Sequence, residues 1–131
     1  MKNVILTLAI VASLILCSCQ NNPTANKDTK LNIEATQFIG SWVQPNPIND
    51  KEVQGFILKN DGTAQSINME TLKYQKWWYE SNSLFLVAES IGNRTSSIDT
   101  MKYEVVKINE KELELKDRDY TDKYRKQLDC N

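Results

Sequence analysis

Residues 51–68 read KEVQGFILKNDGTAQSIN and hold two extended segments on either side of a tight turn. Asn60, Asp61 and Gly62 form the turn, and this residue type is the strongest short-range signal for a β-hairpin. We therefore predict strands over 51–59 and 63–68 that pair with each other. The same alternation of short segments and turn residues continues on both sides of this hairpin, which is typical of an all-β domain.

Six further strands are predicted outside the hairpin. They cover 38–44, 74–80, 84–89, 97–108, 112–116 and 119–125. Turn signals at 45–47, at 81–82 and at Ile91-Gly92-Asn93 separate them. The connection 69–73 is left without an assigned structure, although a turn of helix after Asn68 would suit it.

The long segment 97–108 changes its alternation at Val105-Val106. One bulged residue at this point would bring the apolar residues on both sides of it to the same face of the strand. The residues concerned are Met101, Tyr103, Val105, Val106 and Ile108.

Eight consecutive strands without a helix of ten residues to cover them present a physical problem. An open sheet of this kind would expose one apolar face and two unpaired edges. Closing the sheet on itself removes both faults, so we predict a small eight-stranded antiparallel up-and-down barrel. A barrel of eight strands is either filled by its own side chains or holds one small ligand.

The N-terminal residues have the pattern of an export signal. Lys2 precedes an apolar run over 4–16, which is too short to span a bilayer and suits a secretion signal. Leu16-Cys17-Ser18-Cys19 then resembles the lipobox of bacterial lipoproteins, with Cys19 as the acylated residue. Cys17 is a poorer candidate because bulky Leu16 precedes it, and an ordinary signal peptide that happens to hold two cysteines is the alternative.

The chain is therefore divided into four parts: a signal peptide at 1–18, a flexible tether at 19–36, the barrel at 37–127 and a tail at 128–131. Acyl chains such as palmitate on Cys19 would anchor the protein to a membrane. Gln20, rather than Asp, follows Cys19, which favours the outer membrane and leaves the side of that membrane open. Cys130 would then be a lone thiol in the C-terminal tail.

Composition excludes several classes of function. The chain contains no histidine, which removes Ser–His and Cys–His nucleophilic pairs and the commonest general base. Removal of Lys2 with the signal leaves 15 Lys and Arg (16 − 1) against 17 Asp and Glu, without a basic stripe that would indicate nucleic-acid binding. The run Asp117, Asp119 and Asp122 suits a solvated strand better than a calcium loop. We therefore predict neither an enzyme nor a cofactor or metal site, and a monomer.

Trp77, Trp78 and Tyr79 are consecutive, so they must divide between the two faces of their strand. The aromatic side chains would then line an interior pocket or form an exposed patch, and simple core packing is the alternative. Ser66, Asn68 and Met69 end the third predicted strand, where polar groups could orient a ligand at the barrel mouth. Alternatively, Asn68 caps the next turn and Ser66 faces solvent.

Several segments together resemble the small lipocalin-like lipoproteins of Gram-negative gut anaerobes. Gly40-Ser41-Trp42 looks like the GxW signature of lipocalins, whose tryptophan closes one end of the barrel. The other matching segments are Val43-Gln44-Pro45, Gln54-Gly55-Phe56, Asp61-Gly62-Thr63, Ser66-Ile67-Asn68-Met69, Lys76-Trp77 and Ser90-Ile91-Gly92-Asn93. The domain is smaller than ordinary lipocalins and lacks their long C-terminal helix and their disulfide.

The resemblance implies a barrel that carries a small apolar or amphipathic ligand without catalysis. The predicted ligand-binding residues are Trp42, Phe56, Ser66, Asn68, Trp77, Tyr79 and Tyr103. The alternative is a protein-interaction module of the cell envelope, such as an inhibitor or an accessory subunit, that uses an exposed aromatic face.

Overall fold

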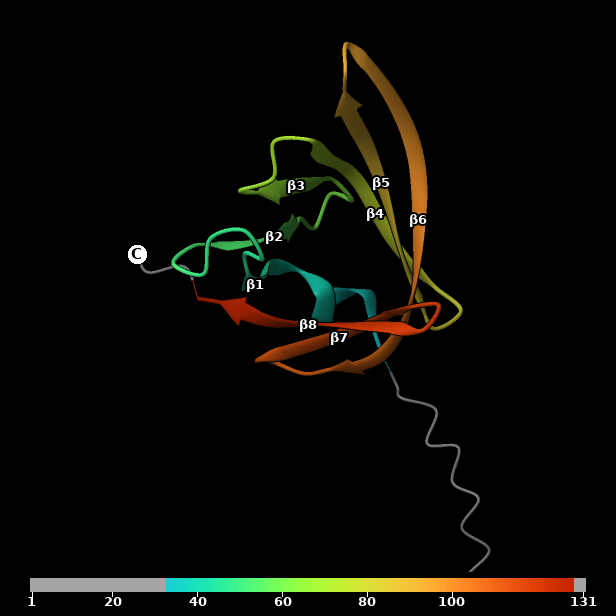
Figure 1. Ribbon diagram of the computed structural model, residues 1–131. Coiled ribbons are helices and arrows are strands. Elements are labelled where there is room, and N and C mark those ends of the chain that lie inside the picture. Colours follow the sequence, from blue (N-terminus) through green and yellow to red (C-terminus); the bar gives the residue numbers. More distant parts are fainter. Residues whose placement is uncertain (1–32, 129–131) are drawn as a thin grey trace, which may run out of the picture. The chain divides into compact units, whose positions relative to one another are not determined.

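A computed structural model describes residues 33–128, which form one eight-stranded antiparallel sheet (Figure 1). A short 3₁₀ helix, η1 (Ala35–Phe38), precedes the strands. The strands are β1 (Gly40–Pro45), β2 (Val53–Leu58), β3 (Ala64–Ile67), β4 (Leu72–Glu80), β5 (Ser83–Gly92), β6 (Thr95–Ile108), β7 (Glu112–Asp117) and β8 (Tyr120–Gln127). Their order in the sheet is β3-β2-β1-β8-β7-β6-β5-β4.

The first and last strands of this order, β3 and β4, approach each other and nearly close the sheet into a barrel. A single β-bridge joins Thr63 to Lys76, and the N–H of Trp77 donates to the carbonyl of Gly62 over 2.9 Å. Because neighbours in the sheet are also neighbours in the chain, except where β1 meets β8, the connections run up and down. The predicted eight-stranded antiparallel barrel is confirmed.

Several predicted strand boundaries were wrong, chiefly those of the first, fourth and fifth strands. The first strand begins at Gly40 rather than at Phe38, because Ala35–Phe38 form η1. The fourth strand begins at Leu72, inside the connection that had no assigned structure. Ile91 and Gly92 continue β5 instead of ending it, since the turn lies at Asn93 and Arg94, whose φ angles of 40° and 65° suit a two-residue hairpin turn.

The predicted bulge in β6 is confirmed, with one correction. The register between β6 and β7 shifts between Val105 and Lys107, while Val105 and Ile108 are both buried. The sequence pattern predicts that Val106 shares this buried face, but Val106 is 42% exposed and lies outside it. Two residues oppose one in a bulge, so the extra residue, here Val106, falls out of the inward alternation.

Aromatic side chains fill one end of the barrel, which we call the closed end. The indole N–H of Trp42, a fully buried residue, donates to the carbonyl of Phe38 over 2.7 Å. The ring centroid of Phe38 lies 6.2 Å from that of Trp77 and 4.9 Å from that of Tyr79. Phe38 from η1 therefore packs across the closed end of the barrel and covers its interior there.

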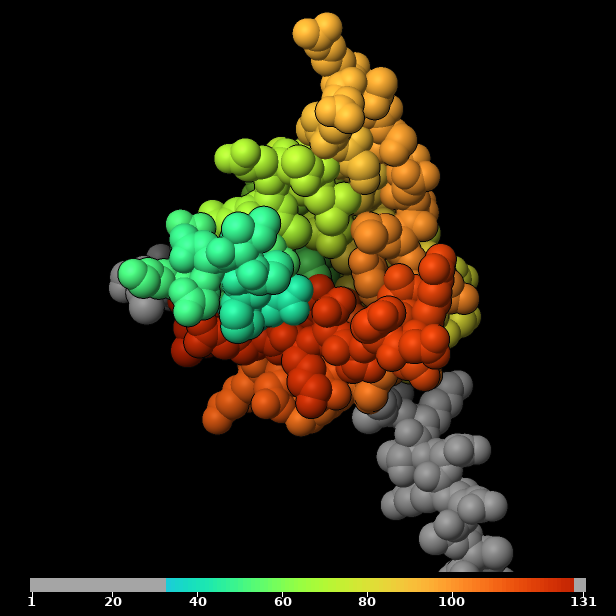
Figure 2. Space-filling model, in the orientation of Figure 1, coloured from blue at the N-terminus to red at the C-terminus, as the bar shows by residue number. Residues whose placement is uncertain are grey.

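The opposite end, which we call the open end, is bounded by the connections 46–52 and 68–71 and by the turns at 93–94 and 118–119. The β5–β6 hairpin extends beyond the other strands here and stands out from the body of the barrel (Figures 1 and 2). No helix within residues 33–128 combines the length and the apolar character that a membrane span requires.

Candidate functional site

A hollow of about 560 Å³ lies at the open end, between the connections 46–52 and 68–71. Its lining includes Gln54, Asn68, Met69, Glu70 and Leu72. This volume falls in the range of small-molecule pockets, ~300–1,000 Å³. The hollow is therefore the candidate ligand site of the barrel.

The strands place the hollow directly above a layer of aromatic side chains. Gln54 precedes Phe56 by two residues in β2, and Leu72 precedes Tyr74 by two residues in β4. Residues two apart in a strand point to the same face. Because Phe56 and Tyr74 are buried core residues, Gln54 and Leu72 point toward the interior one step nearer to the open end.

The aromatic layer consists of Phe56, Tyr74, Tyr103 and Tyr124, which we call the tyrosine floor. The Phe56 ring packs edge-on against Tyr74, with centroids 5.6 Å apart, and lies 5.0 Å from the ring of Tyr124. The Tyr103 hydroxyl donates to the sulfur of Met101 over 3.5 Å. Each of the three tyrosines is 8% exposed, so the floor is close-packed.

Half-buried apolar side chains surround this floor. Met69, Leu72 and Met101 pack against the core and remain partly accessible. Met69 and Leu72 also line the hollow. The open end therefore offers an apolar rim above hydroxyl groups, and thioether side chains adapt readily to ligands of different shape.

The tyrosine hydroxyls remain protonated at neutral pH. Burial raises the pKa of Tyr74, Tyr103 and Tyr124 above the usual value for tyrosine, and the carboxylate of Asp122 raises all three pKa values further. Both causes disfavour the negative phenolate. The floor can therefore donate hydrogen bonds to a ligand.

Three of the predicted site residues lie at this end. Phe56 and Tyr103 belong to the tyrosine floor, and Asn68 lines the hollow. The Asn68 side chain donates to the carbonyl of Val53 over 2.7 Å, and thereby ties the end of β3 to the start of β2 rather than capping the turn that follows it.

Ser66 lies at the seam between β3 and β4, where its half-buried hydroxyl bonds to the backbone of β4 and does not simply face solvent. Trp42, Trp77 and Tyr79 lie at the closed end, packed around Phe38. The Trp77 indole N–H donates to the carbonyl of Lys59 over 2.8 Å. The structure therefore does not bring these four residues to the hollow.

The three consecutive aromatic residues of β4 divide between the faces. Trp77 and Tyr79 point inward, whereas Trp78 is 40% exposed on the outside. Its ring stacks on Phe85 with centroids 5.0 Å apart and planes 4° apart, and Lys102 Nζ lies 5.8 Å from the Phe85 centroid. An aromatic patch of Trp78 and Phe85 thus exists on the outer surface.

Sequence reasoning did not assign Tyr74, Tyr124, Leu72 or Met101 to the site. Tyr124 shares one side of the last strand with Tyr120, but nothing in the sequence showed that this side was the interior. Leu72 lay in the unassigned connection. The sequence did hold one signal for these positions. A tyrosine follows an apolar residue by two positions in two strands, as in Leu72 and Tyr74 and in Met101 and Tyr103.

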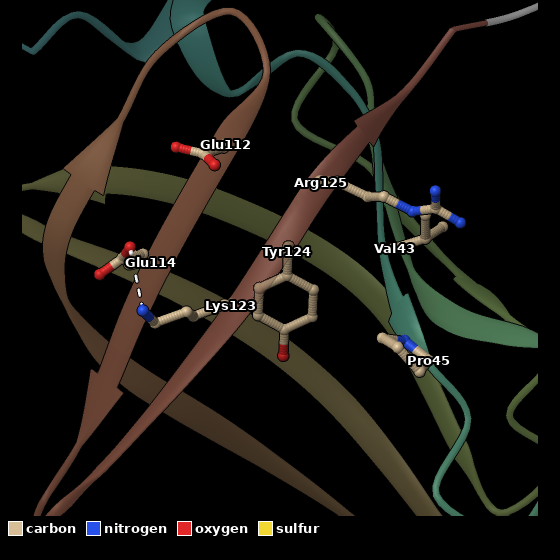
Figure 3. A pocket seen from close by; sticks show the side chains of 7 residues that line it. All are labelled: Val43, Pro45, Glu112, Glu114, Lys123, Tyr124 and Arg125. Atoms are coloured by element: carbon tan, nitrogen blue, oxygen red, sulfur yellow. Dashed lines mark ion pairs between the residues drawn. The ribbon is translucent and has the colours of Figure 1, made fainter. Parts of the chain in front are cut away.

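A second hollow, of about 500 Å³, lies over the outer faces of β1, β7 and β8 (Figure 3). Glu112 and Glu114 line it from β7, and Lys123 and Arg125 from β8. The register pairs Glu112 with Arg125 and Glu114 with Lys123, and the latter two approach to 3.7 Å. Their charges balance across the strands, which is typical of a solvated sheet surface.

A metal-ion site requires several acidic or thiol side chains that converge on one point. Within residues 33–128, no three Cys, Asp or Glu side chains converge closely enough to hold a metal ion. The aspartates of the 117–122 run belong to the end of β7, the turn and β8.

The fold and its hollow define the class of this protein as a small, nearly closed β-barrel with a candidate ligand site at one end. The model of the lipocalin-like family matches residues 34–127, and the chain belongs to this family. The predicted family resemblance is thus confirmed. Lipocalin-like barrels support the binding of small hydrophobic ligands in general.

The chain is also similar to a solved structure, a lipocalin-like protein from Bacteroides thetaiotaomicron VPI-5482. The two are 33% identical, the match covers 69% of this chain and 96% of the other, and the TM-score is 0.65. A search of curated proteins found no match.

Proposed function

We propose that this protein is a lipid-anchored, monomeric binding protein of the cell envelope that holds a small apolar or amphipathic ligand without catalysis. The observation that supports binding most directly is the pair of apolar side chains Met69 and Leu72, which line the hollow and stay half-buried beside the aromatic core. A ligand chain that covers these side chains removes their remaining apolar surface from water, at ~25 cal/mol per Å².

Titration with an environment-sensitive hydrophobic dye tests this proposal. The protein used is the mature chain with Cys19→Ser, which lacks the signal peptide and the acyl chains. We expect this protein to bind the dye saturably, with one dye molecule per chain. Leu72→Gln, in the rim, should weaken dye binding about tenfold, which corresponds to ~1.4 kcal/mol. The matched control Val106→Gln changes an exposed residue of the outer face and should leave binding unaltered. Absence of saturable binding by a panel of such dyes would contradict the proposal.

Membrane anchoring is the second part of the proposal, and it rests on residues outside the described range. The supporting pattern is Leu16-Cys17-Ser18-Cys19 after the apolar run. Growth with a clickable palmitate analogue should label the wild-type protein and the Cys17→Ser variant, but not Cys19→Ser. Label that is lost with Cys17→Ser and retained with Cys19→Ser would reverse the assignment.

The residue after Cys19, which is Gln20 rather than Asp, supports the proposal of an outer-membrane location. Density-gradient fractionation should find the wild-type protein with the outer membrane, and Gln20→Asp should retain more of it in the inner membrane. Protease treatment of intact cells would then show which side the barrel faces. Equal distribution of both variants would contradict the sorting role of Gln20.

A protein-interaction module is a second candidate, and the exposed Trp78–Phe85 patch is the observation that favours it. Aromatic residues are enriched at protein interfaces. Crosslinking in the native host should then give a discrete product that Trp78→Ala removes and Leu72→Gln does not. Loss of the crosslinked product in Leu72→Gln but not in Trp78→Ala would instead place the contact at the ligand site.

A further inference from the structure

The outer face of β4 and β5 carries contiguous apolar surface. Trp78 is 40% exposed and stacks on the half-buried ring of Phe85. Val87 follows Phe85 by two residues in β5, so it points to the same outer face, where it is also half-buried. Val87 therefore extends the Trp78–Phe85 patch along β5.

The outer faces of β7 and β8 have a different character. Their outward positions hold five charged residues and one threonine, which are Glu112, Glu114, Lys116, Thr121, Lys123 and Arg125. Exposed apolar side chains that are scattered singly need no partner, whereas contiguous ones indicate a contact surface. The Trp78–Phe85 patch is thus a contact surface on one side of the barrel.

The charged side chains around the Trp78–Phe85 patch balance one another. The register places three lysines and three glutamates on the same outer face, namely Lys73, Lys76, Lys102, Glu80, Glu89 and Glu104. A strongly acidic or strongly basic partner would meet as many like charges as opposite ones. A layer of zwitterionic lipid head groups, which itself holds both charges, is complementary to such a surface.

The chain enters the barrel at the end where Trp78 lies. Tyr79, the next residue in β4, points inward, and its ring centroid is 4.9 Å from that of Phe38 in η1. Ile33, the first described residue, packs against the same core just before η1. The residues that precede Ile33 are therefore joined to the barrel at the closed end, close to the Trp78–Phe85 patch.

The length of the preceding chain limits how far the barrel can move from its anchor. Ile33 follows Cys19, the proposed acylation site, by 14 positions (33 − 19). A fully extended chain covers at most ~3.6 Å per residue, so Ile33 stays within about 50 Å of Cys19. This covalent link gives the Trp78–Phe85 patch a high effective concentration at the bilayer, where even a weak contact would be occupied.

We propose that the Trp78–Phe85 patch rests on the surface of the bilayer that holds the lipid anchor, among zwitterionic head groups. Tryptophan is favoured at the level of lipid head groups. Lys102, whose Nζ lies 5.8 Å from the Phe85 centroid, can keep its ammonium in the same layer. The inference rests on the lipid anchor of the proposed function, and it assigns this patch to lipid rather than to a protein partner.

Vesicles that carry the chain at Cys19 test the inference. In the mature chain with Cys130→Ser, Cys19 is the only thiol and can be coupled to a maleimide lipid in phosphatidylcholine vesicles. Lipids brominated near the head group quench tryptophans that reach the bilayer surface. We expect quenching that Trp78→Phe abolishes, because Trp42 and Trp77 are buried.

Two results would overturn the inference: no quenching, or quenching that Trp78→Phe leaves unchanged. No quenching together with a crosslinked product that depends on Trp78 would assign the patch to a protein instead. Palmitate labelling at Cys19 and dye binding in the hollow do not depend on this contact, so the proposed function would stand in each case.

Variants that keep Trp78 as the reporter locate the contact. Phe85→Gln removes its stacking partner from the apolar surface and should lower the quenching at least about twofold. The matched control Ile48→Gln changes a 95% exposed apolar residue at the open end and should leave the quenching unaltered. Equal losses in both variants would mean that general surface hydrophobicity causes the contact, and the inference would be wrong. Thermal unfolding confirms that each barrel is intact.

Salt separates lipid contact through the rings from ionic attraction. Because the charges around the patch balance, raising NaCl from about 0.1 M to about 0.5 M should leave the quenching unchanged. Loss of quenching at the higher concentration would show that ionic attraction holds the barrel to the bilayer, and would contradict the inference.

Discussion

The Ser66 hydroxyl accepts a hydrogen bond from the backbone N–H of Tyr74 over 2.8 Å, and it donates one to the carbonyl of Leu72 over 2.6 Å. One side chain thus supplies the two bonds that a paired strand would make at this part of the seam between β3 and β4. Nearer the closed end, the backbone of Gly62 and Thr63 performs the same task. The seam of the barrel is therefore held by a serine at its open end.

Ser66→Ala should open this seam. The variant leaves the N–H of Tyr74 and the carbonyl of Leu72 without their partner, so we expect a loss of about 1–3 kcal/mol in the free energy of unfolding. Urea denaturation measures this loss, and amide exchange at Tyr74 should accelerate. Ser97→Ala, in the exposed part of the β5–β6 hairpin, is the control and should stay within about 0.5 kcal/mol of the wild type. Unchanged protection at Tyr74 would contradict the role of Ser66.

Trp42 and Trp78 should respond differently to the same substitution. Trp42→Phe removes the donor to the carbonyl of Phe38 and leaves space in a fully buried site, so we expect a loss of about 2–4 kcal/mol in unfolding free energy. Trp78→Phe keeps an aromatic ring over Phe85 on the surface and should change stability by about 0.5 kcal/mol or less. Equal losses in urea denaturation would mean that the closed end does not depend on the Trp42 contact.

Gly55 and Gly92 form another matched pair. A Cβ on Gly55 would clash with the backbone oxygen of Trp42 in the neighbouring strand, whereas a Cβ on Gly92 would meet no atom within 4 Å. Because backbone cannot move aside as a side chain can, Gly55→Ala should cost about 3 kcal/mol or more, or prevent folding. Gly92→Ala should be tolerated within about 0.5 kcal/mol. Soluble yield and thermal midpoint compare the two, and a stable Gly55→Ala barrel would show that β1 and β2 can separate without loss.

Alkaline pH should destabilise the barrel through its tyrosines. The folded-state pKa values of Tyr74, Tyr103 and Tyr124 are raised, chiefly by burial, so the folded protein holds these protons more tightly than the unfolded chain does. Their contribution to stability is complete below the unfolded pKa of about 10 and is lost progressively as the pH rises beyond it. Urea midpoints from pH 8 to pH 12 would record the decline. Tyr124→Phe should reduce the fall of the urea midpoint with rising pH. An identical pH dependence in that variant would contradict the contribution of Tyr124.

Much of the architecture could be predicted from the residues alone. The Asn60-Asp61-Gly62 turn, the alternation of Leu113 and Leu115, and the slip at Val105-Val106 each depend on local geometry, which a strand's period of two makes visible. Barrel closure followed from the lack of any helix to cover the sheet. Half-buried positions at the open end could not be predicted in the same way, because a residue's exposure there depends on how far the neighbouring strands extend.

The orientation of the β4 aromatics shows where local reasoning stops. The register between β4 and β5 shifts between Tyr74 and Lys76, so Gln75 is an extra residue and Tyr74 and Trp77 both point inward although they are three apart. A single strand carries no mark of such a bulge, since only its partner defines the register.

The sequence by itself determined the number of strands, most of their turns and the family, because these follow from short-range preferences and from the need to bury one apolar face. Only the tertiary structure decided that Ser66 closes the seam, that Trp42 and Trp77 pack the closed end, and that three tyrosines from different strands pack together in the core. Those features depend on residues distant in the chain coming within a few ångströms of one another, which the register of the closed sheet alone sets.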